Sequence, residues 1–250
     1  MMDNIPQALF DFFEKMPRQG PGSLVLTERL LRTFRSLLPS HPVAADMGCG
    51  SGAATLVLAR QGISVTGVDV HAPFLEALRH KADQEGLGPL VRTCQSSMLE
   101  TGLGDESLDL IWSEGAVFTV GFENALQAFW AILKKGGLLG VSDCFLFQEK
   151  VPQHVRKQWD EWDPHIKTVA DSMKIAERLG YRFLHAERLT PDMWEESYFQ
   201  PMKRVIASIE ADPSASPGLR DIVRANRREI DFFRQNNEYY GYVFHILQKP

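Results

Sequence analysis

A segment near residue 50 is rich in residues that let a backbone approach a ligand closely. An apolar run from Val43 ends at Asp46, and glycines follow at alternate positions, Gly48, Gly50 and Gly52. Glycine adopts positive φ angles and has no Cβ, so a turn built from it leaves room for a bound group. The helix predicted directly after the turn would present unpaired N–H groups there. Strand, turn and helix are typical of the first half of a nucleotide-binding βαβ unit.

An acidic residue at the end of the next predicted strand completes this unit. The strand over residues 63–68 is followed by Asp69, roughly 20 residues beyond the glycines, where a carboxylate accepts hydrogen bonds from both ribose hydroxyls. The glycines alone are ambiguous, because the first two, with Ala53, also fit the dinucleotide fingerprint of NAD enzymes. Asp46 opposes NAD, since its carboxylate suits the ammonium of a methionine moiety or its bound water and would repel a pyrophosphate.

This pattern resembles the class I S-adenosylmethionine (SAM)-dependent methyltransferases, on residues 46–52 and on Asp69. The resemblance extends over residues 40–145 and includes a helix that ends in Gly136-Gly137 before a hydrophobic strand. Within the family, the chain is most similar to the group that holds the ubiquinone/menaquinone-type and other small-molecule enzymes. The resemblance therefore implies SAM as the cofactor.

The resemblance also implies which residues bind SAM, and they lie at the ends of predicted strands. They are Asp46, Gly48, Cys49, Gly50, Gly52, Asp69, Val70, Ser97, Met98, Ser113 and Glu114. Ser97 stands where the family commonly has an acid that bonds the adenine amino group, and Met98 is expected against the adenine ring. Glu114 follows the fourth predicted strand, near the switch point of the sheet. It is the candidate catalytic residue, expected to orient the cofactor amine, take a proton from the substrate or hold a cationic substrate.

The predicted elements form an α/β fold. The resemblance implies a Rossmann-like seven-stranded sheet in the order 3-2-1-4-5-7-6, with helices on both faces. An aromatic-rich helix over residues 5–16 opens the chain, and a helix over residues 123–135 is expected to end in a cap at Gly136-Gly137. The expected domains are an N-terminal helical cap (1–40), the SAM-binding α/β core (41–190), a helical insertion acting as a lid (191–237) and the last strand of the core (238–250).

Composition limits the partners and the location. The chain has 250 residues and a net charge of −5, which argues against a nucleic-acid backbone as partner. Its three cysteines have no metal spacing, so no metal is expected and a reduced, cytoplasmic protein is the simplest interpretation. The N-terminus lacks the features of a signal peptide, and no apolar run approaches the roughly 18 residues that a membrane span needs. A homodimer is among the expectations.

The function expected is SAM-dependent transfer of a methyl group to a small-molecule acceptor by in-line displacement. Two alternatives stay open, an NAD-dependent oxidoreductase and a non-catalytic SAM-binding protein. Asp143 and His71 also lie at strand exits and are further candidate bases, without a sequence signature. Four aromatic residues are expected either to shape the acceptor pocket or to pack the insertion onto the core, and these are Trp159, Trp162, Trp194 and Tyr198.

Overall fold

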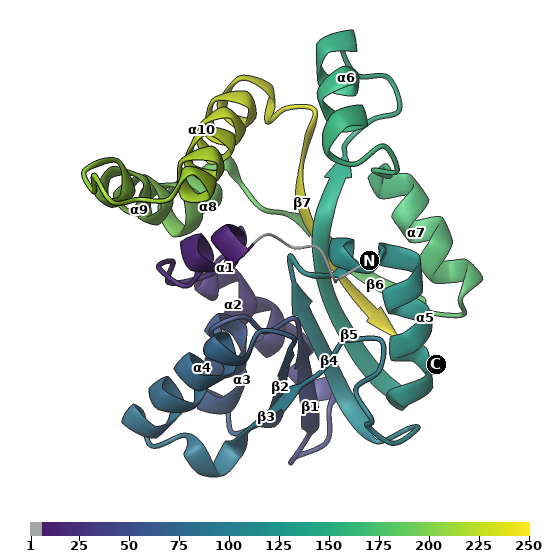
Figure 1. The fold of residues 1–250 in the computed structure, drawn as a ribbon. Coiled ribbons are helices and arrows are strands. Elements are labelled where there is room, and N and C mark those ends of the chain that lie inside the picture. Colours follow the sequence, from purple (N-terminus) through teal and green to yellow (C-terminus); the bar gives the residue numbers. More distant parts are fainter. Residues whose placement is uncertain (1–6) are drawn as a thin grey trace.

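The computed structural model describes residues 7–250 and contains a seven-stranded sheet in the order β3-β2-β1-β4-β5-β7-β6 (Figure 1). The strands are β1 (Val43–Met47), β2 (Ser64–Asp69), β3 (Val91–Gln95), β4 (Leu108–Glu114), β5 (Leu133–Leu146), β6 (Arg182–Arg188) and β7 (Tyr240–Gln248). Strand β7 is antiparallel to both of its neighbours, and the other pairs are parallel. This arrangement confirms the predicted fold class.

Helices cover both faces of the sheet (Figure 1). The α-helices are α1 (Gln7–Phe13), α2 (Leu24–Phe34), α3 (Ala53–Arg60), α4 (Ala72–Gln84), α5 (Phe122–Ile132), α6 (Gln153–Trp162), α7 (Val169–Arg178), α8 (Pro191–Trp194), α9 (Gln200–Glu210) and α10 (Pro217–Asn236). Apolar side chains of α2 and α3 pack on one face, and those of α5 and α7 pack on the other. Ile5, which the predicted first helix includes, lies outside the described residues.

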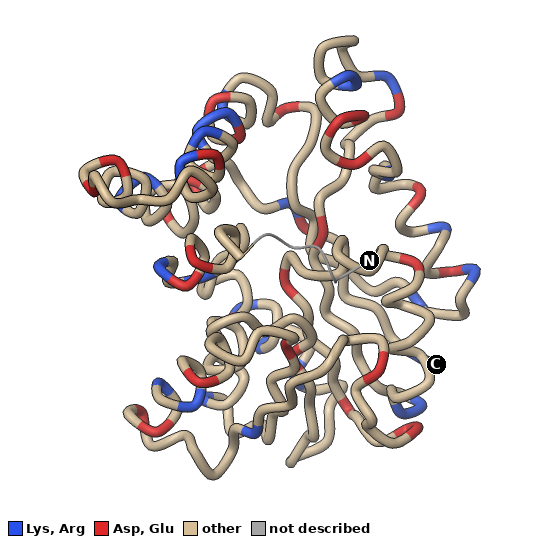
Figure 2. The backbone as a smooth tube through the Cα atoms, in the orientation of Figure 1, with Lys and Arg blue, Asp and Glu red and all other residues tan. Residues whose placement is uncertain are grey.

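The segment between β6 and β7 is helical and lies beside α1 (Figure 1). It contains α8, a π-helical turn over Glu195–Phe199, α9 and α10. Figure 2 shows that basic and acidic residues are interspersed along α10, as on a solvated face, rather than gathered into a basic surface. Whether this insertion acts as a lid stays a prediction. In residues 7–250, no helix has both the length and the apolar character needed to cross a membrane.

Strand β5 begins earlier than the sequence pattern indicates. Helix α5 ends at Ile132, and Leu133 is already extended and paired with Leu108 of β4. Gly136 has a φ of +82° inside β5, and its N–H donates to the carbonyl of Lys249 over 2.7 Å. The predicted glycine cap was therefore wrong, because the backbone groups near these glycines bond to a neighbouring segment instead of closing a helix.

The parallel strands bring the predicted site residues to one edge of the sheet. In the register of β1, Asp46 lies between Gly67 of β2 and Trp112 of β4. The carboxyl ends of these three strands therefore lie side by side. The glycine turn follows β1, and Asp69 and Glu114 are the last residues of β2 and β4. This edge is where open α/β sheets bind their ligands.

Candidate active site

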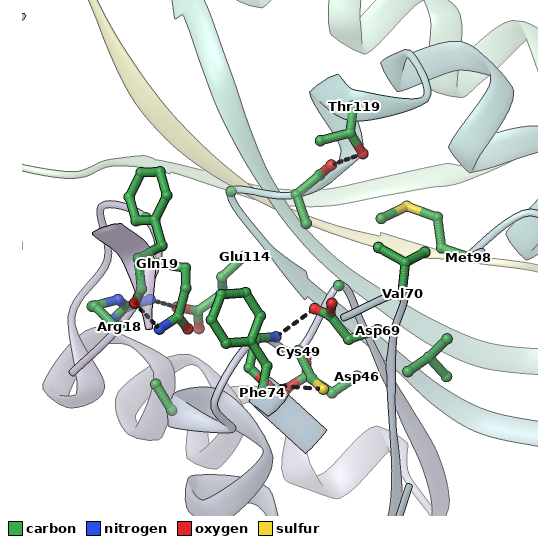
Figure 3. A pocket seen from close by; sticks show the side chains of 18 of the residues that line it. Arg18, Gln19, Asp46, Cys49, Asp69, Val70, Phe74, Met98, Glu114 and Thr119 are labelled. Atoms are coloured by element: carbon green, nitrogen blue, oxygen red, sulfur yellow. Dashed lines mark hydrogen bonds and ion pairs between the residues drawn. The ribbon is translucent and has the colours of Figure 1, made fainter. Parts of the chain in front are cut away.

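A cavity of about 200 Å³ lies at the carboxyl edge of the sheet. Its walls come from α1, the loop after α1, the glycine turn, the end of β2 and the loop after β4. Figure 3 shows Arg18, Gln19 and Glu114 together at one side of this cavity, with Asp69 and Met98 at the other. Segments that are far apart in the sequence thus enclose one site.

The glycine turn needs glycine for both conformation and space. Gly48 and Gly50 have φ angles of +71° and +51°, in the left-handed region that side chains disfavour. A Cβ built on Gly48 would lie 2.3 Å from the Cβ of Ala116, across the cavity wall. The N–H groups of Gly48 and Cys49 both donate to the carbonyl of Val68, over 2.8 and 3.0 Å. The turn is therefore fixed against β2 with its backbone exposed to the cavity.

Asp69 joins the end of β2 to the glycine turn. Its Oδ2 accepts the N–H of Gly50 over 2.8 Å, and its Oδ1 accepts the N–H of His71 over 2.9 Å. Burial raises the pKa of this carboxyl, and the backbone hydrogen bonds from His71 and Gly50 oppose the shift. Each carboxylate oxygen has a second lone pair, so Asp69 can still accept hydrogen bonds from a ligand in the cavity.

Asp46 is a buried acid beneath the turn. Only 1% of the residue is exposed, and its Oδ2 accepts the hydroxyl of Thr55 over 2.6 Å. Burial raises the pKa of Asp46 to about 7, although the hydrogen bond from Thr55 lowers it in part. Asp46 also lines the cavity. A carboxyl with a pKa in this range changes charge near neutral pH. A cationic group bound beside Asp46 would therefore favour its ionised form.

Glu114 accepts three hydrogen bonds from side chains. The donors are Nη2 of Arg18 at 2.7 Å, the hydroxyl of Thr27 at 2.5 Å and Nε1 of Trp112 at 2.8 Å. The side chains of Arg18 and Glu114 are 10% and 6% exposed, so this ion pair is buried. It fixes the loop before α2 to the sheet edge. A carboxylate with these partners is already neutralised, and the catalytic role of Glu114 stays a prediction.

Two hydrogen-bond donors of Arg18 have no partner within the described residues, and Arg18 lines the cavity. Its Nε and Nη1 atoms are buried, and no hydrogen-bond partner for them is found in residues 7–250. The neighbouring Gln19 connects two elements, because its Oε1 accepts the N–H of Ser51 over 2.9 Å and its Nε2 donates to the carbonyl of Phe13 over 3.2 Å. Prolines and glycines over residues 17–22 end the first helix, and the resemblance to the methyltransferases implies that this loop helps to close the cofactor pocket.

Eight of the eleven predicted cofactor residues line the cavity, namely Asp46, Gly48, Cys49, Gly50, Asp69, Val70, Met98 and Glu114. The other three lie just outside it. Gly52 precedes α3, the hydroxyl of Ser97 accepts the N–H of Leu99 over 3.2 Å, and the buried hydroxyl of Ser113 donates to the carbonyl of Met47 over 2.7 Å. Ser96 lines the cavity where the sequence pattern pointed to Ser97.

Aromatic residues from α1, α4 and the loop after β4 complete the walls. Sequence reasoning did not assign Phe10, Phe13, Phe74 or Phe118 to the site, and all of them line it. Phe10 stacks on His71, with ring centroids 4.0 Å apart, so α1 is held over the end of β2. Periodicity along one helix could not reveal this contact, because the partner ring comes from another element.

The buried Asp46 predicts a pH dependence of stability. Its pKa rises from 3.8 to about 7 on folding, so between these values the folded state binds more protons than the unfolded state. The contribution of Asp46 to the free energy of unfolding therefore decreases as the pH rises from about 4 to about 7, and is constant above that. Urea unfolding of the ligand-free protein and of Asp46→Asn should show a stability difference that changes across this window. A difference independent of pH would contradict the prediction.

Comparisons with known proteins agree with this geometry. Residues 45–141 match the family model described as a methyltransferase domain. An uncharacterized methyltransferase of Bacillus subtilis, YodH, is 24% identical over 230 residues, which are 92% of this chain and 93% of that protein. The crystal structure of YjhP from E. coli aligns with a TM-score of 0.83 and 19% identity, covering 97% of this chain and 99% of the other.

A further solved structure has the same fold. It is a SAM-dependent methyltransferase from Geobacter sulfurreducens in complex with S-adenosylhomocysteine, with a TM-score of 0.80, 19% identity and 99% of each chain covered. None of these findings favours the NAD-dependent or the non-catalytic alternative. Residues 45–141 therefore form a methyltransferase domain, and the sequence motif, the strand order and the relatives support SAM-dependent methyl transfer as its activity.

Proposed function

We propose that the cavity at the carboxyl edge of the sheet binds SAM and presents its methyl group to a small-molecule acceptor. The observation that carries this proposal is the convergence of Asp46, the glycine turn, Asp69 and Met98 on one enclosed space. The residues present fit the cofactor, because Arg18 lines the cavity and its buried Nε and Nη1 have no hydrogen-bond partner within residues 7–250. Aromatic residues of α1 line the cavity and would limit the entry of water.

The ribose and adenine are assigned to the end of β2 and its surroundings. Asp69 would accept hydrogen bonds from the ribose hydroxyls with the lone pairs that its backbone bonds leave free. Met98 is 6% exposed, lines the cavity and would pack on the adenine ring, for which a polarizable thioether is well suited. Ser96, which lines the cavity, takes the place that was expected of Ser97.

The methionine part is assigned to the other end. The spare Nε and Nη1 donors of Arg18 suit a carboxylate, since a guanidinium binds carboxylates through its planar fork of N–H groups. Asp46 suits the ammonium group from below the turn. Glu114 would then act mainly by holding Arg18 in position. Bound SAM supplies an electrophilic methyl group, and this chain contributes orientation and the exclusion of water.

The remaining expectations concern the cellular location, the size of the acceptor and the oligomeric state. We propose a cytoplasmic location, which is supported by three cysteines that are all free in the described part of the chain. The acceptor is expected to be small, because the loop after α1 and the loop after β4 meet over the cavity, where a Cβ on Gly20 would be 3.6 Å from the carbonyl of Gly115. The homodimer stays a prediction.

Titration calorimetry with SAM, S-adenosylhomocysteine and NAD in parallel tests the cofactor assignment. We expect the first two to bind and NAD not to bind. Gly48→Ala should abolish binding, because its Cβ would project against Ala116. Gly62→Ala is the matched control, since Gly62 also has a positive φ, +75°, but has no atom within 4 Å of an added Cβ. Binding of NAD, or equal binding by both variants, would contradict the proposal.

A further inference from the structure

The loop that carries Arg18 lies between the helical insertion and the cofactor cavity. It comprises residues 14–23, which join α1 to α2, and we call it the Arg18 loop. Arg18, Gln19 and Gly20 of this loop line the cavity. Figure 1 shows α1 beside the helices of the insertion, and Figure 3 shows Arg18 and Gln19 at the cavity with Glu114. A contact between the insertion and the Arg18 loop can therefore act on the cofactor site without touching the cofactor.

The guanidinium of Arg18 lies against the backbone of Gly22. A Cβ built on Gly22 would be 2.1 Å from Nη2 of Arg18, 2.4 Å from its Cζ and 2.6 Å from its Nη1. Gly22 does not have a positive φ, so glycine is needed here for space and not for the conformation of the backbone. Gly22 thus supports the guanidinium, while Glu114 accepts a hydrogen bond from Nη2 over 2.7 Å.

These two contacts fix the guanidinium and leave its other donors for a ligand. Nε and Nη1 of Arg18 are buried, and they have no hydrogen-bond partner in residues 7–250. An arginine side chain loses much rotamer freedom when it is held by a ligand, so a guanidinium that is already held in place binds at a lower entropic cost. The backbone position of Gly22 therefore affects how well Arg18 meets a carboxylate in the cavity.

The insertion contacts Gly22 through Ser197, the middle residue of the π-helical turn. The hydroxyl of Ser197 lies within hydrogen-bond distance of the carbonyl of Gly22, 175 positions away in the chain, and 2.5 Å from the carbonyl of Met193. A hydroxyl has one proton, so the two carbonyls share it. No other donor to the carbonyl of Gly22 is found in residues 7–250. Ser197 therefore links the insertion to the backbone that supports Arg18.

A second contact places α1 against the same insertion. A Cβ built on Gly218, near the start of α10, would lie 3.1 Å from the Cβ of Ala8 in α1. Phe12 is buried and belongs to the same hydrophobic core as Phe199 and Met202 of the insertion. The insertion thus contacts the chain both before and after Arg18, and it holds the Arg18 loop from two sides.

We propose that the helical insertion positions Arg18 for the carboxylate of the cofactor, with Gly22 and Ser197 as the positioning residues. This inference rests on the proposed function, because it takes the methionine carboxylate as the ligand of Arg18. Ser197 holds the carbonyl of Gly22, Gly22 supports the guanidinium, and the guanidinium presents Nε and Nη1 to the carboxylate. The insertion then serves cofactor recognition, although no residue from 191 to 237 lines the cavity. A π-helical turn is consistent with this role, since such turns often occur at functional sites.

Two ligands that differ in a single group test the inference. S-Adenosylhomocysteine is compared by titration calorimetry with 5′-deoxy-5′-(3-aminopropylthio)adenosine, which lacks only the carboxylate. We expect the unaltered protein to bind S-adenosylhomocysteine about tenfold more tightly than this analogue. The ratio of the two dissociation constants measures recognition of the carboxylate, and a variant that merely disturbs the fold would weaken both ligands alike. Equal binding of the two ligands by the unaltered protein would overturn the inference.

Gly22→Ala tests the support of the guanidinium. The added methyl group would displace the end of the Arg18 side chain, so we expect S-adenosylhomocysteine to bind about tenfold more weakly and the analogue to change by less than about twofold. Gly88→Ala is the matched control. A Cβ on Gly88 would lie 2.6 Å from Oδ1 of Asp83, again the end of a side chain, but outside the cavity lining. Equal weakening of both ligands by Gly22→Ala, or weakening of neither, would contradict the proposed role of Gly22.

Ser197→Ala tests the contribution of the insertion, and it serves equally if Gly22→Ala does not fold. It removes the hydroxyl that holds the carbonyl of Gly22, so we expect about threefold weaker binding of S-adenosylhomocysteine and unchanged binding of the analogue. Ser214→Ala is the matched control, since Ser214 is an exposed serine of the same insertion whose hydroxyl donates to Asp212 over 2.6 Å. An unaltered ratio of the two dissociation constants in Ser197→Ala would overturn the inference. Failure of the unaltered protein to bind either ligand would instead overturn the proposed function, so the two failures are distinguishable.

Discussion

Replacement of Asp69 by alanine is expected to weaken SAM binding by about ten- to a hundredfold. Hydrogen bonds to a charged group contribute about 1.5–3 kcal/mol, and every 1.4 kcal/mol corresponds to about a factor of ten in affinity. The carboxylate also accepts the N–H groups of Gly50 and His71, so its loss would loosen the turn as well as remove the ribose acceptor. Titration calorimetry with SAM measures the combined effect.

A second substitution separates these two contributions. Asp69→Asn keeps one carbonyl oxygen and the size of the side chain but removes the charge, so we expect it to bind SAM with an intermediate affinity. Asp105→Ala is the control, because Asp105 is an exposed acid in the loop before β4, away from the cavity lining. Unchanged SAM affinity in a folded Asp69→Ala protein would remove the ribose assignment.

The glycine turn was predictable because its signal is local, whereas the strand order followed from the resemblance to class I methyltransferases. The first strand is a short apolar run, and the turn between Asp46 and Gly52 follows directly from it. The parallel order then brings Asp69 and Glu114 to the same edge without any knowledge of their contacts. Local patterns failed at Gly136, where the backbone bonds to a segment more than a hundred residues away.

The partners of the site residues were not predictable, because they depend on tertiary packing. Arg18 and Glu114 are 96 positions apart in the chain, and no periodicity connects them. The same is true of the contact between Phe10 and His71, which joins α1 to the end of β2. Charge and spacing indicated that Glu114 lies at the cavity, but they could not show that its carboxylate is already paired.

The second large effect is a loss of stability, and it is expected for Glu114→Gln. Removal of one partner from a buried ion pair leaves an uncompensated charge and typically costs about 3–5 kcal/mol. Here Arg18 would be left with its guanidinium buried and with a weaker acceptor. Urea unfolding measures the loss. Glu85→Gln is the matched control, because Glu85 also pairs with an arginine, Arg60, but at the surface, where such pairs contribute about 0–1 kcal/mol. Equal losses in the two variants would contradict the prediction.

A double variant shows whether this pair serves stability alone. Arg18→Met combined with Glu114→Gln removes both charges, so we expect most of the lost stability to return, as for other buried pairs replaced by apolar groups. SAM affinity should not return, because Arg18 is assigned to the methionine carboxylate through its spare donors. Recovery of both properties would make the pair purely structural. Recovery of stability without binding would mean that the chain retains a buried charge at this position in order to hold its cofactor.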